Sequence, residues 1–274
     1  MGELFNELLF RPIINILVLI YQVLLSLHIP YALGFSIILL TILIRFVLYP
    51  LTTAQLKSSK KMQDIAPHLS NLKAKHKNDA KKLQAETMKL YKEHGVNPAS
   101  GCLPIIIQLP LIWTLYSVLQ KIVMLNSNTV SEVNKYLYNY DFLKLTHPWN
   151  ATFFGLPLGQ NPSHLISTIP LIILVPLFTG VFQFVQSKMM IVKQNPEQTK
   201  EATGKEEKKQ GDFASAFQTQ SLYIFPAMIG FFSYSFPIGL SLYWNTFTIF
   251  GILQQYRIQG WGGLFPKKSK ILTT

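Results

Sequence analysis

One arginine lies inside a long apolar stretch of this chain. Residues 33–53, LGFSIILLTILIRFVLYPLTT, are long and apolar enough to span a membrane as a helix, and Arg45 stands within them. Thr41, Arg45 and Tyr49 follow one another at i, i+4 and share one helical face, whereas Ser36 falls on the opposite side. An arginine near the centre of a spanning helix raises the free energy of membrane insertion by about 2.5–3.5 kcal/mol. Such a residue therefore normally faces a partner, a cavity or water. One narrow face of this helix is therefore polar, and most of the rest suits hydrocarbon.

No arrangement of residues in the sequence is typical of catalysis or of metal binding. The six histidines are scattered over loops and helix ends without a ligand spacing. Cys102 is the single cysteine, which excludes an intramolecular disulfide and a cysteine metal cluster. Neither a phosphate-binding glycine loop nor a nucleophile elbow is found, and every Asp and Glu falls outside the predicted spans, which disfavours a proton-coupled transporter. We expect no enzyme activity, no cofactor and no metal site.

Three interpretations of Arg45 remain open from the residue pattern alone. In the first, the side chain extends along the helix and places its charge at the cytoplasmic interface. In the second, Arg45 lines the pore of a small-solute channel or transporter. In the third, Arg45 and nearby hydroxyl and amide groups hold water inside the membrane, so that polar parts of a client protein can enter without full desolvation.

The composition is that of a polytopic membrane protein. The 274 residues are 49% hydrophobic and only 14% charged, with a mean hydropathy of +0.25, whereas soluble domains average about 25% charged residues. The net charge of +12 comes mostly from lysines in segments predicted to be cytoplasmic, as the positive-inside rule requires. Binding to anionic lipid or to RNA is a secondary explanation of this charge, and DNA is not expected as a partner.

Apolar runs and charge divide the chain into an all-α arrangement with five predicted spans. Between Pro12 and Pro30, an amphipathic stretch fits an interfacial helix better than a span, although its length allows both. The predicted order is an external N-terminal region at 1–32 containing the interfacial helix, a first span at 33–53, a basic cytoplasmic helical hairpin at 54–100, a second span at 101–125, an external loop at 126–163, a third span at 164–187, a disordered cytoplasmic loop at 188–218, a fourth span at 219–236, a fifth span at 238–257 and a cytoplasmic tail at 258–274.

The basic segment has helical order despite its charge. Two apolar stripes at 3-4-3 spacing predict two helices that pack on each other, and Asp79 and Gly95 are placed to begin and to end the second of them. The stripes consist of Met62, Ile65, Leu69 and Leu72, and of Ala80, Leu83, Thr87 and Leu90. The preferred interpretation of the lysines in this segment is a solvated helix face that also determines the membrane topology. A binding surface is the second interpretation.

Several longer motifs carry a family resemblance. Residues 34–62, GFSIILLTILIRFVLYPLTTAQLKSSKKM, and 90–119, LYKEHGVNPASGCLPIIIQLPLIWTLYSVL, resemble YidC-type membrane protein insertases, as do FFGLPL at 153–158, QSKMM at 186–190 and FPIGLSLYW at 236–244. The resemblance implies five core helices around a hydrophilic groove that is closed outside and open to the cytoplasm and to lipid. It also implies that the amphipathic stretch 12–29 lies on the external surface, and that the chain is a short form without the large periplasmic domain.

The resemblance assigns groove positions residue by residue. Arg45 matches the groove arginine and Thr41 a groove hydroxyl, while Gln186 and Trp244 correspond to further positions, with Tyr243 as the alternative to Trp244. The predicted substrate groove consists of Arg45, Thr41, Gln108, Gln183, Gln186, Tyr243, Trp244 and Asn245. Gln183, Gln186, Asn245 and Thr248 are the expected polar partners of Arg45 on other helices.

The function that the resemblance implies is insertion and folding of integral membrane proteins, alone or with the Sec translocon. The expected partners are nascent membrane proteins and anionic lipids, with the Sec translocon, the ribosome and signal recognition particle components as further candidates. The expected location is the bacterial plasma (inner) membrane, with the N-terminus outside and the C-terminus in the cytoplasm. A small-solute channel or transporter lined by Arg45 is the alternative.

Overall fold

The fold is mostly helical, which confirms the predicted all-α class. A computed structural model describes residues 3–76, 79–95, 103–123, 129–190 and 212–265. The chain separates into two compact units, each built from three segments. The first unit comprises Met1–Tyr49, Ile105–Gln183 and Ala227–Phe250, and the second comprises Pro50–Pro104, Phe184–Pro226 and Gly251–Thr274. The predicted loop 188–218 lies mostly outside the described residues.

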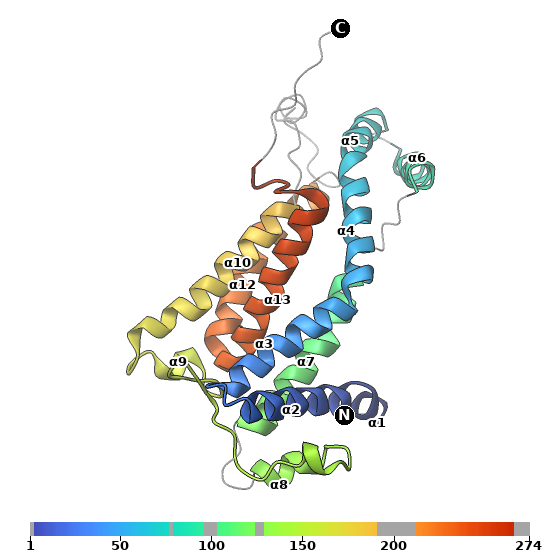
Figure 1. Cartoon of the computed structure of the whole chain (residues 1–274). Helices are drawn as coiled ribbons and strands as arrows, with labels where there is room; N and C mark the ends of the chain where they lie inside the picture. The colour runs from blue at the N-terminus through green and yellow to red at the C-terminus, as the bar shows by residue number, and fades with distance from the viewer. Residues whose placement is uncertain (1–2, 77–78, 96–102, 124–128, 191–211, 266–274) are drawn as a thin grey trace. The chain divides into compact units, whose positions relative to one another are not determined.

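Figure 1 shows the elements along the chain. The first three, α1, η1 and α2, follow one another without a break, and α10, α12 and α13 each have residues in both units. In chain order the elements are α1 Glu3–Phe5, η1 Asn6–Phe10, α2 Arg11–Ser26, α3 Ala32–Val47, α4 Tyr49–Asp64, α5 Ala66–Lys75, α6 Ala80–Glu93, α7 Leu103–Val123, α8 Thr129–Asn134, η3 Asp141–Leu143, β1 Thr152–Phe153, β2 Leu156–Pro157, α9 Pro162–Leu165, η4 Pro170–Ile173, α10 Leu174–Met190, α12 Asp212–Ser235 and α13 Ile238–Gln259.

Two proline positions shift helix boundaries from those predicted. The stretch 33–53 is not one continuous helix, because α3 ends at Val47 and α4 begins at Tyr49. Pro50 has no backbone N–H and its ring collides with the carbonyl four residues earlier, so the helix breaks there. The third predicted span begins at Pro170 and not at His164, since Ile169 before the proline is extended at φ −129° and ψ 83°.

Length and apolar composition identify candidate spans among the described residues. Glu3–Ser26 and Pro170–Met190 are each long and apolar enough to cross a membrane, and Ala32–Val47 with Tyr49–Met62 meets the same test as a bent pair. Gln108–Leu119 and Leu222–Ser235 are shorter apolar helices. These helices are consistent with a membrane protein, and the count of five spans remains a prediction.

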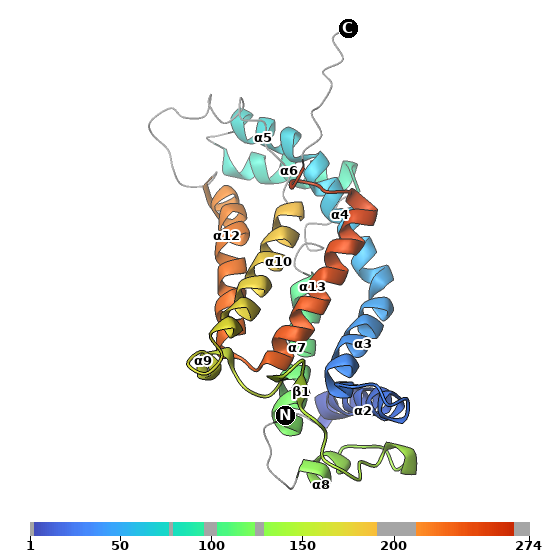
Figure 2. The same ribbon diagram turned by 60° about the vertical axis from the view of Figure 1, so that its left-hand side comes forward.

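Three faces of helix α2 have different surroundings. Ile14, Leu17 and Val18 are fully buried and belong to the same core as Leu33 and Ile37 of α3. A second face of α2 carries the polar residues Asn15 and Gln22 and is covered by the segment 136–145. Asn15 binds the backbone of residues 136 and 138, and Gln22 donates to the Lys144 carbonyl. Leucines and a valine are exposed on its remaining surface. Figures 1 and 2 show α2 lying across the lower ends of α3 and α7.

Small residues bring α10 and α12 close together in the first unit. A Cβ on Gly230 would lie 3.3 Å from the Pro176 carbonyl oxygen and 3.6 Å from Gly180 Cα, a close approach of the kind found between membrane helices. Beside it, the Ser233 hydroxyl donates to Thr179 Oγ1 at 3.1 Å and lies 2.8 Å from Ser241 Oγ. This buried hydroxyl cluster joins α10, α12 and α13, which run side by side in Figure 2.

A short β-hairpin packs against the start of α3. Strands β1 and β2 pair antiparallel, with Phe154 at φ 48° and Gly155 at φ 81° in the turn. The Phe153 ring occupies the space that a side chain at Gly34 would need, since a Cβ there would lie 2.0 Å from Phe153 Cδ2. The next residues pair with the start of α13, where the Gly239 amide donates to the Leu158 carbonyl at 2.8 Å. The hairpin therefore connects α3 to α13.

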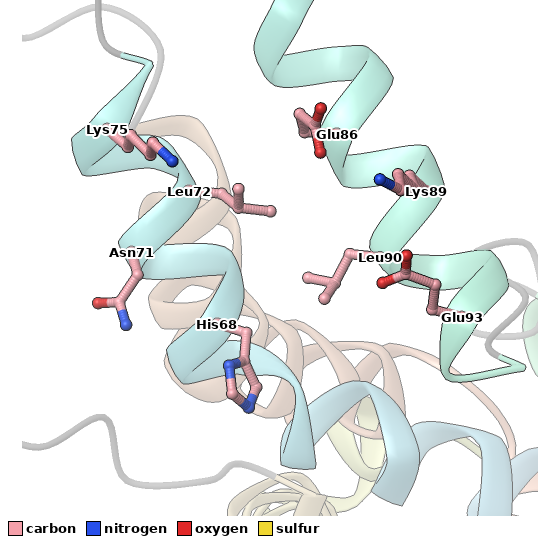
Figure 3. A pocket seen from close by; sticks show the side chains of 8 residues that line it. All are labelled: His68, Asn71, Leu72, Lys75, Glu86, Lys89, Leu90 and Glu93. Carbon is pink, nitrogen blue, oxygen red and sulfur yellow. The ribbon is translucent and has the colours of Figure 1, made fainter.

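In the second unit, α5 and α6 form an antiparallel pair. The Asp79 side chain caps α6 by accepting from the Lys82 amide at 3.0 Å, and Gly95 follows the helix at φ 59°, as predicted. Figure 3 shows Leu72 of α5 and Leu90 of α6, one residue from each predicted apolar stripe, pointing toward each other. Met62 of the first stripe lies on α4, so that stripe does not belong to a single helix. A hollow of about 320 Å³ between the helices is lined by His68, Asn71, Leu72, Lys75, Glu86, Lys89, Leu90 and Glu93.

Candidate functional site

The side chain of Arg45 is buried in the first unit, on the last turn of α3. It is 4% exposed. Its Nε donates to the backbone carbonyl of Phe247 on α13 at 3.1 Å, and its Nη2 donates to the same oxygen. These bonds join residues that are 202 positions apart in the chain. Arg45 therefore ties α3 to α13 within this unit, where the two helices lie next to each other (Figures 1 and 2).

Aromatic rings also surround the guanidinium. Arg45 Cζ lies 3.3 Å from the centroid of the Phe247 ring and 5.8 Å from that of Phe250. The face of an aromatic ring attracts a cation, by about 2 kcal/mol or more where water is excluded. No carboxylate in the described part of the chain forms an ion pair with Arg45, since the ion pairs found there join other residues. The positive charge is held by a carbonyl dipole and two rings, without a counter-ion.

The observed hydrogen-bond acceptor of Arg45 is a backbone oxygen and not one of the side chains that were expected to bind it. The sequence interpretation expects side-chain amides, including Gln183 and Asn245, whereas the observed acceptor is the backbone oxygen of Phe247. A helix carbonyl has a second lone pair, which is available to a donor from a neighbouring helix. The bond is possible because Arg45 is long enough to reach across from α3 to the main chain of α13.

Thr41 lies one turn before Arg45 and is completely buried. Its Oγ1 donates to the Ile37 carbonyl at 2.6 Å, so its own helix satisfies the hydroxyl. Tyr49 was predicted on the same face, but it belongs to α4 because α3 ends before it. The predicted polar line is therefore reduced to Thr41 and Arg45.

Four of the predicted groove residues form two side-chain pairs in the first unit. Gln108 on α7 donates from Nε2 to the Tyr243 hydroxyl on α13 at 2.6 Å, and Tyr243 is fully buried. Trp244 on α13 donates from Nε1 to Gln183 Oε1 on α10 at 3.1 Å. The two adjacent residues of α13 thus bind helices on different sides. Both Tyr243 and Trp244 take part in polar contacts, so neither excludes the other as the family position.

Asn245 and Thr248 leave polar atoms unpaired in the interior. Asn245 Oδ1 and Thr248 Oγ1 are buried and have no hydrogen-bond partner among the described residues. Unpaired buried groups are rare in folded proteins, where water or another polar group normally satisfies them. Gln186 lies one turn after Gln183 on α10 and belongs to the second unit. Gln55 and Gln255, also in the second unit, each have an unpaired buried Nε2.

Sequence reasoning missed two parts of this site. Phe247 was not singled out, because an apolar aromatic residue in an apolar helix carries no signal of polar binding. The hydroxyl cluster of Thr179, Ser233 and Ser241 was not among the predicted groove residues. The described residues contain no group of three or more His, Cys, Asp or Glu placed to hold a metal ion.

The sequence as a whole was compared with known proteins. The sequence model of the family described as 60Kd inner membrane protein matches residues 24–262, which includes every residue of the site. The chain belongs to this family. The match covers both units described above, so the 60Kd inner membrane protein family accounts for α3 and α13 as well as for the hairpin of α5 and α6.

Individual members of the 60Kd inner membrane protein family are similar over most of the chain. The membrane protein insertase YidC of Fusobacterium nucleatum is 32% identical over 226 residues, covering 82% of this chain and 85% of the relative. The membrane protein insertase MisCA of Bacillus subtilis is 34% identical over 234 residues, covering 83% and 70%. The inner membrane protein ALBINO3, chloroplastic, of Arabidopsis thaliana is 30% identical over 257 residues, covering 88% of this chain and 49% of the relative.

Proposed function

We propose that this chain is a membrane protein insertase that receives the polar parts of its clients at Arg45. Membership of the 60Kd inner membrane protein family supports the activity, as does the likeness to relatives that are named insertases. The observation that carries the role of Arg45 is the setting of its guanidinium. The group is buried and keeps its full charge, because a carbonyl and aromatic rings hold it and no carboxylate among the described residues neutralises it.

Two observations bear on the other two interpretations of Arg45. A snorkelling arginine places its guanidinium in water, whereas Arg45 is 4% exposed and lies against Phe247, so its burial disfavours snorkelling. The names of the relatives point to protein clients rather than to small solutes, which disfavours the channel or transporter.

The proposed topology has five spans, with the N-terminus outside and the C-terminus in the cytoplasm of a bacterial inner membrane. The proposed spans are those predicted from the sequence, 33–53, 101–125, 164–187, 219–236 and 238–257, with the first bent at Leu48 and the continuous helix of the third beginning at Pro170. The lysine-rich segments 54–100 and 188–218 then lie inside, as the positive-inside rule requires. The α2 helix lies in the external interface, with segment 136–145 on its polar side and its exposed leucines toward lipid.

The proposed route begins in the cytoplasm. The hairpin 54–100 guides a nascent helix that has a short polar external segment, and this segment enters a hydrophilic groove at Arg45. The guanidinium still has N–H donors that the Phe247 carbonyl does not use, and these can bind a client carboxylate. The client helix then leaves sideways into lipid, driven by about 25 cal/mol for each Å² of apolar surface that is buried.

The proposed lining of the groove is Arg45 with the polar side chains around it. The unpaired oxygens of Asn245 and Thr248 favour water at this level of α13, because water can satisfy them. The proposed partners are nascent membrane proteins and anionic lipids, with the Sec translocon, the ribosome and signal recognition particle components as further candidates.

The proposal is tested by exchanging the charge at position 45. In a strain depleted of its own insertase, Arg45→Lys should keep client insertion and Arg45→Ala should lose it, because lysine keeps the charge. Crosslinking from positions 41, 45 and 244 to a stalled nascent membrane protein measures contact directly. Equal growth of the two variants would refute the electrostatic role, and solute flux through liposomes that depends on Arg45 would favour the transporter.

A further inference from the structure

Phe247 contacts Arg45 in two ways at once. Its backbone oxygen accepts the hydrogen bonds from Nε and Nη2, and its ring lies 3.3 Å from Arg45 Cζ at the centroid. The backbone contact fixes where the guanidinium lies along α13, and the ring contact covers one face of its plane. No other residue of the described chain contacts the guanidinium in both ways.

The ring matters because no carboxylate among the described residues forms an ion pair with Arg45. A buried ion without compensation is strongly disfavoured, and a flexible arginine leaves such a place when it can. Backbone carbonyl and ring together replace part of the lost hydration without cancelling the charge. Phe250, one turn further along α13, contributes less to the guanidinium, since its centroid is 5.8 Å away and its ring packs on Phe46 at 5.3 Å.

We propose that Phe247 is the positioning residue of the site, and that its ring holds the Arg45 charge where acidic groups of a client are bound. This inference rests on the proposed function, because it needs Arg45 to bind clients. It adds a specificity: the Phe247 ring supports insertion of clients with carboxylates in their external segment and has no part in insertion of neutral clients. Phe247 itself touches the arginine and not the client.

The test uses two versions of one single-span client, which differ only in their external segment. One version carries Asp and Glu there, and the other carries Asn and Gln at the same positions. The full-length insertase is reconstituted in liposomes, and the inserted fraction is measured by protection from protease. The variants are Phe247→Leu, which removes the ring but keeps an apolar side chain, and Phe247→Tyr, which keeps a ring. Phe250→Leu is the comparison on the same helix, because it removes a ring that lies farther from the guanidinium.

Phe247→Leu should lower insertion of the acidic client by about thirtyfold, the effect of losing a desolvated cation–π contact. It should leave the neutral client unchanged. Phe247→Tyr should restore insertion of the acidic client, and Phe250→Leu should lower it less than Phe247→Leu does, because the Phe250 ring lies farther from the guanidinium. An equal loss for both clients would show that Phe247 is merely structural and would overturn the inference, as would unchanged insertion of both.

Arg45→Ala, measured beside these variants, separates the two proposals. If Arg45→Ala lowers insertion of the acidic client and Phe247→Leu does not, only the positioning role of Phe247 fails. If Arg45→Ala also leaves the acidic client unchanged, the proposed function of Arg45 fails as well. The neutral client reports in every case whether the variant is folded and inserted into the liposome.

Discussion

One buried amide joins α2 to the segment 136–145, and its removal should release that segment. Asn15 is 4% exposed. Its Nδ2 donates to the Tyr136 carbonyl at 3.1 Å and to the Arg11 carbonyl at 2.7 Å, and its Oδ1 accepts from the Tyr138 amide at 2.8 Å. Asn15→Leu keeps a similar volume but removes both the donor and the acceptor. The substitution therefore isolates the hydrogen bonds from the packing.

The expected loss of stability of the segment 136–145 follows from the backbone groups that lose a hydrogen bond in Asn15→Leu. The Tyr138 amide loses its acceptor, while the Tyr136 carbonyl keeps a long bond of 3.5 Å from Arg11 Nε. A partly buried polar group without a partner costs about 1–3 kcal/mol, and the added apolar contact of leucine offsets a fraction of this. We expect the segment to become about 2 kcal/mol easier to open, or roughly thirty times more often open.

Amide hydrogen exchange in the segment 136–145, followed by mass spectrometry of the protein in lipid nanodiscs, measures this opening. Gln22→Leu is the matched control, because Gln22 lies on the same polar line of α2 and donates to the Lys144 carbonyl at 3.3 Å in an exposed position. Loss of the Gln22 hydrogen bond should change the amide exchange rate of the segment 136–145 by less than about threefold. Equal exchange in the Asn15 and Gln22 variants would refute the assignment of Asn15 as the residue that fixes the segment.

Three further predictions concern other elements. Gly34→Ala should destabilise the protein by about 1–2 kcal/mol, because the added Cβ would meet the Phe153 ring at 2.0 Å; the thermal midpoint should fall, and adding Phe153→Ala should restore part of it. Asp79→Ala should cost α6 about 1 kcal/mol through loss of its cap, measured as faster amide exchange over 80–93, whereas unchanged exchange would refute the cap. Deleting residues 57–93 should abolish client insertion while the remaining helices stay folded by circular dichroism, and undiminished insertion would reject the role of the hairpin.

Local signals in the sequence were sufficient for much of the fold. Asp79 and Gly95 were predicted to begin and end α6, and they do so in the structure, because a helix cap depends on residues within one turn of it. The break before Pro50 also has a local cause. It was missed because the apolar run continues across Tyr49 and Pro50, and the length of that run outweighed the proline in the interpretation.

Contacts between distant segments could not be predicted in the same way. Asn15 lies in the stretch whose amphipathic pattern predicts an interfacial helix, and that pattern gave no sign that its amide binds the backbone of residues 136 and 138. The sequence does not show whether a side-chain amide forms its hydrogen bonds with water or with the backbone of another segment. The acceptor of Arg45 is likewise a backbone oxygen, and every residue has one. Side-chain patterns therefore located Arg45 but could not identify Phe247.

The choice of partners for Arg45 bears directly on function. A carboxylate on a neighbouring helix would hold the guanidinium more strongly, but it would also cancel the charge that a client must find. A carbonyl dipole and a ring stabilise the same cation and leave its net charge in place. Under the proposed function, a client carboxylate would meet a cation whose net charge is not cancelled by an ion pair among the described residues. The arrangement would therefore combine stabilisation of a buried arginine with attraction of acidic clients, which a salt bridge would not achieve.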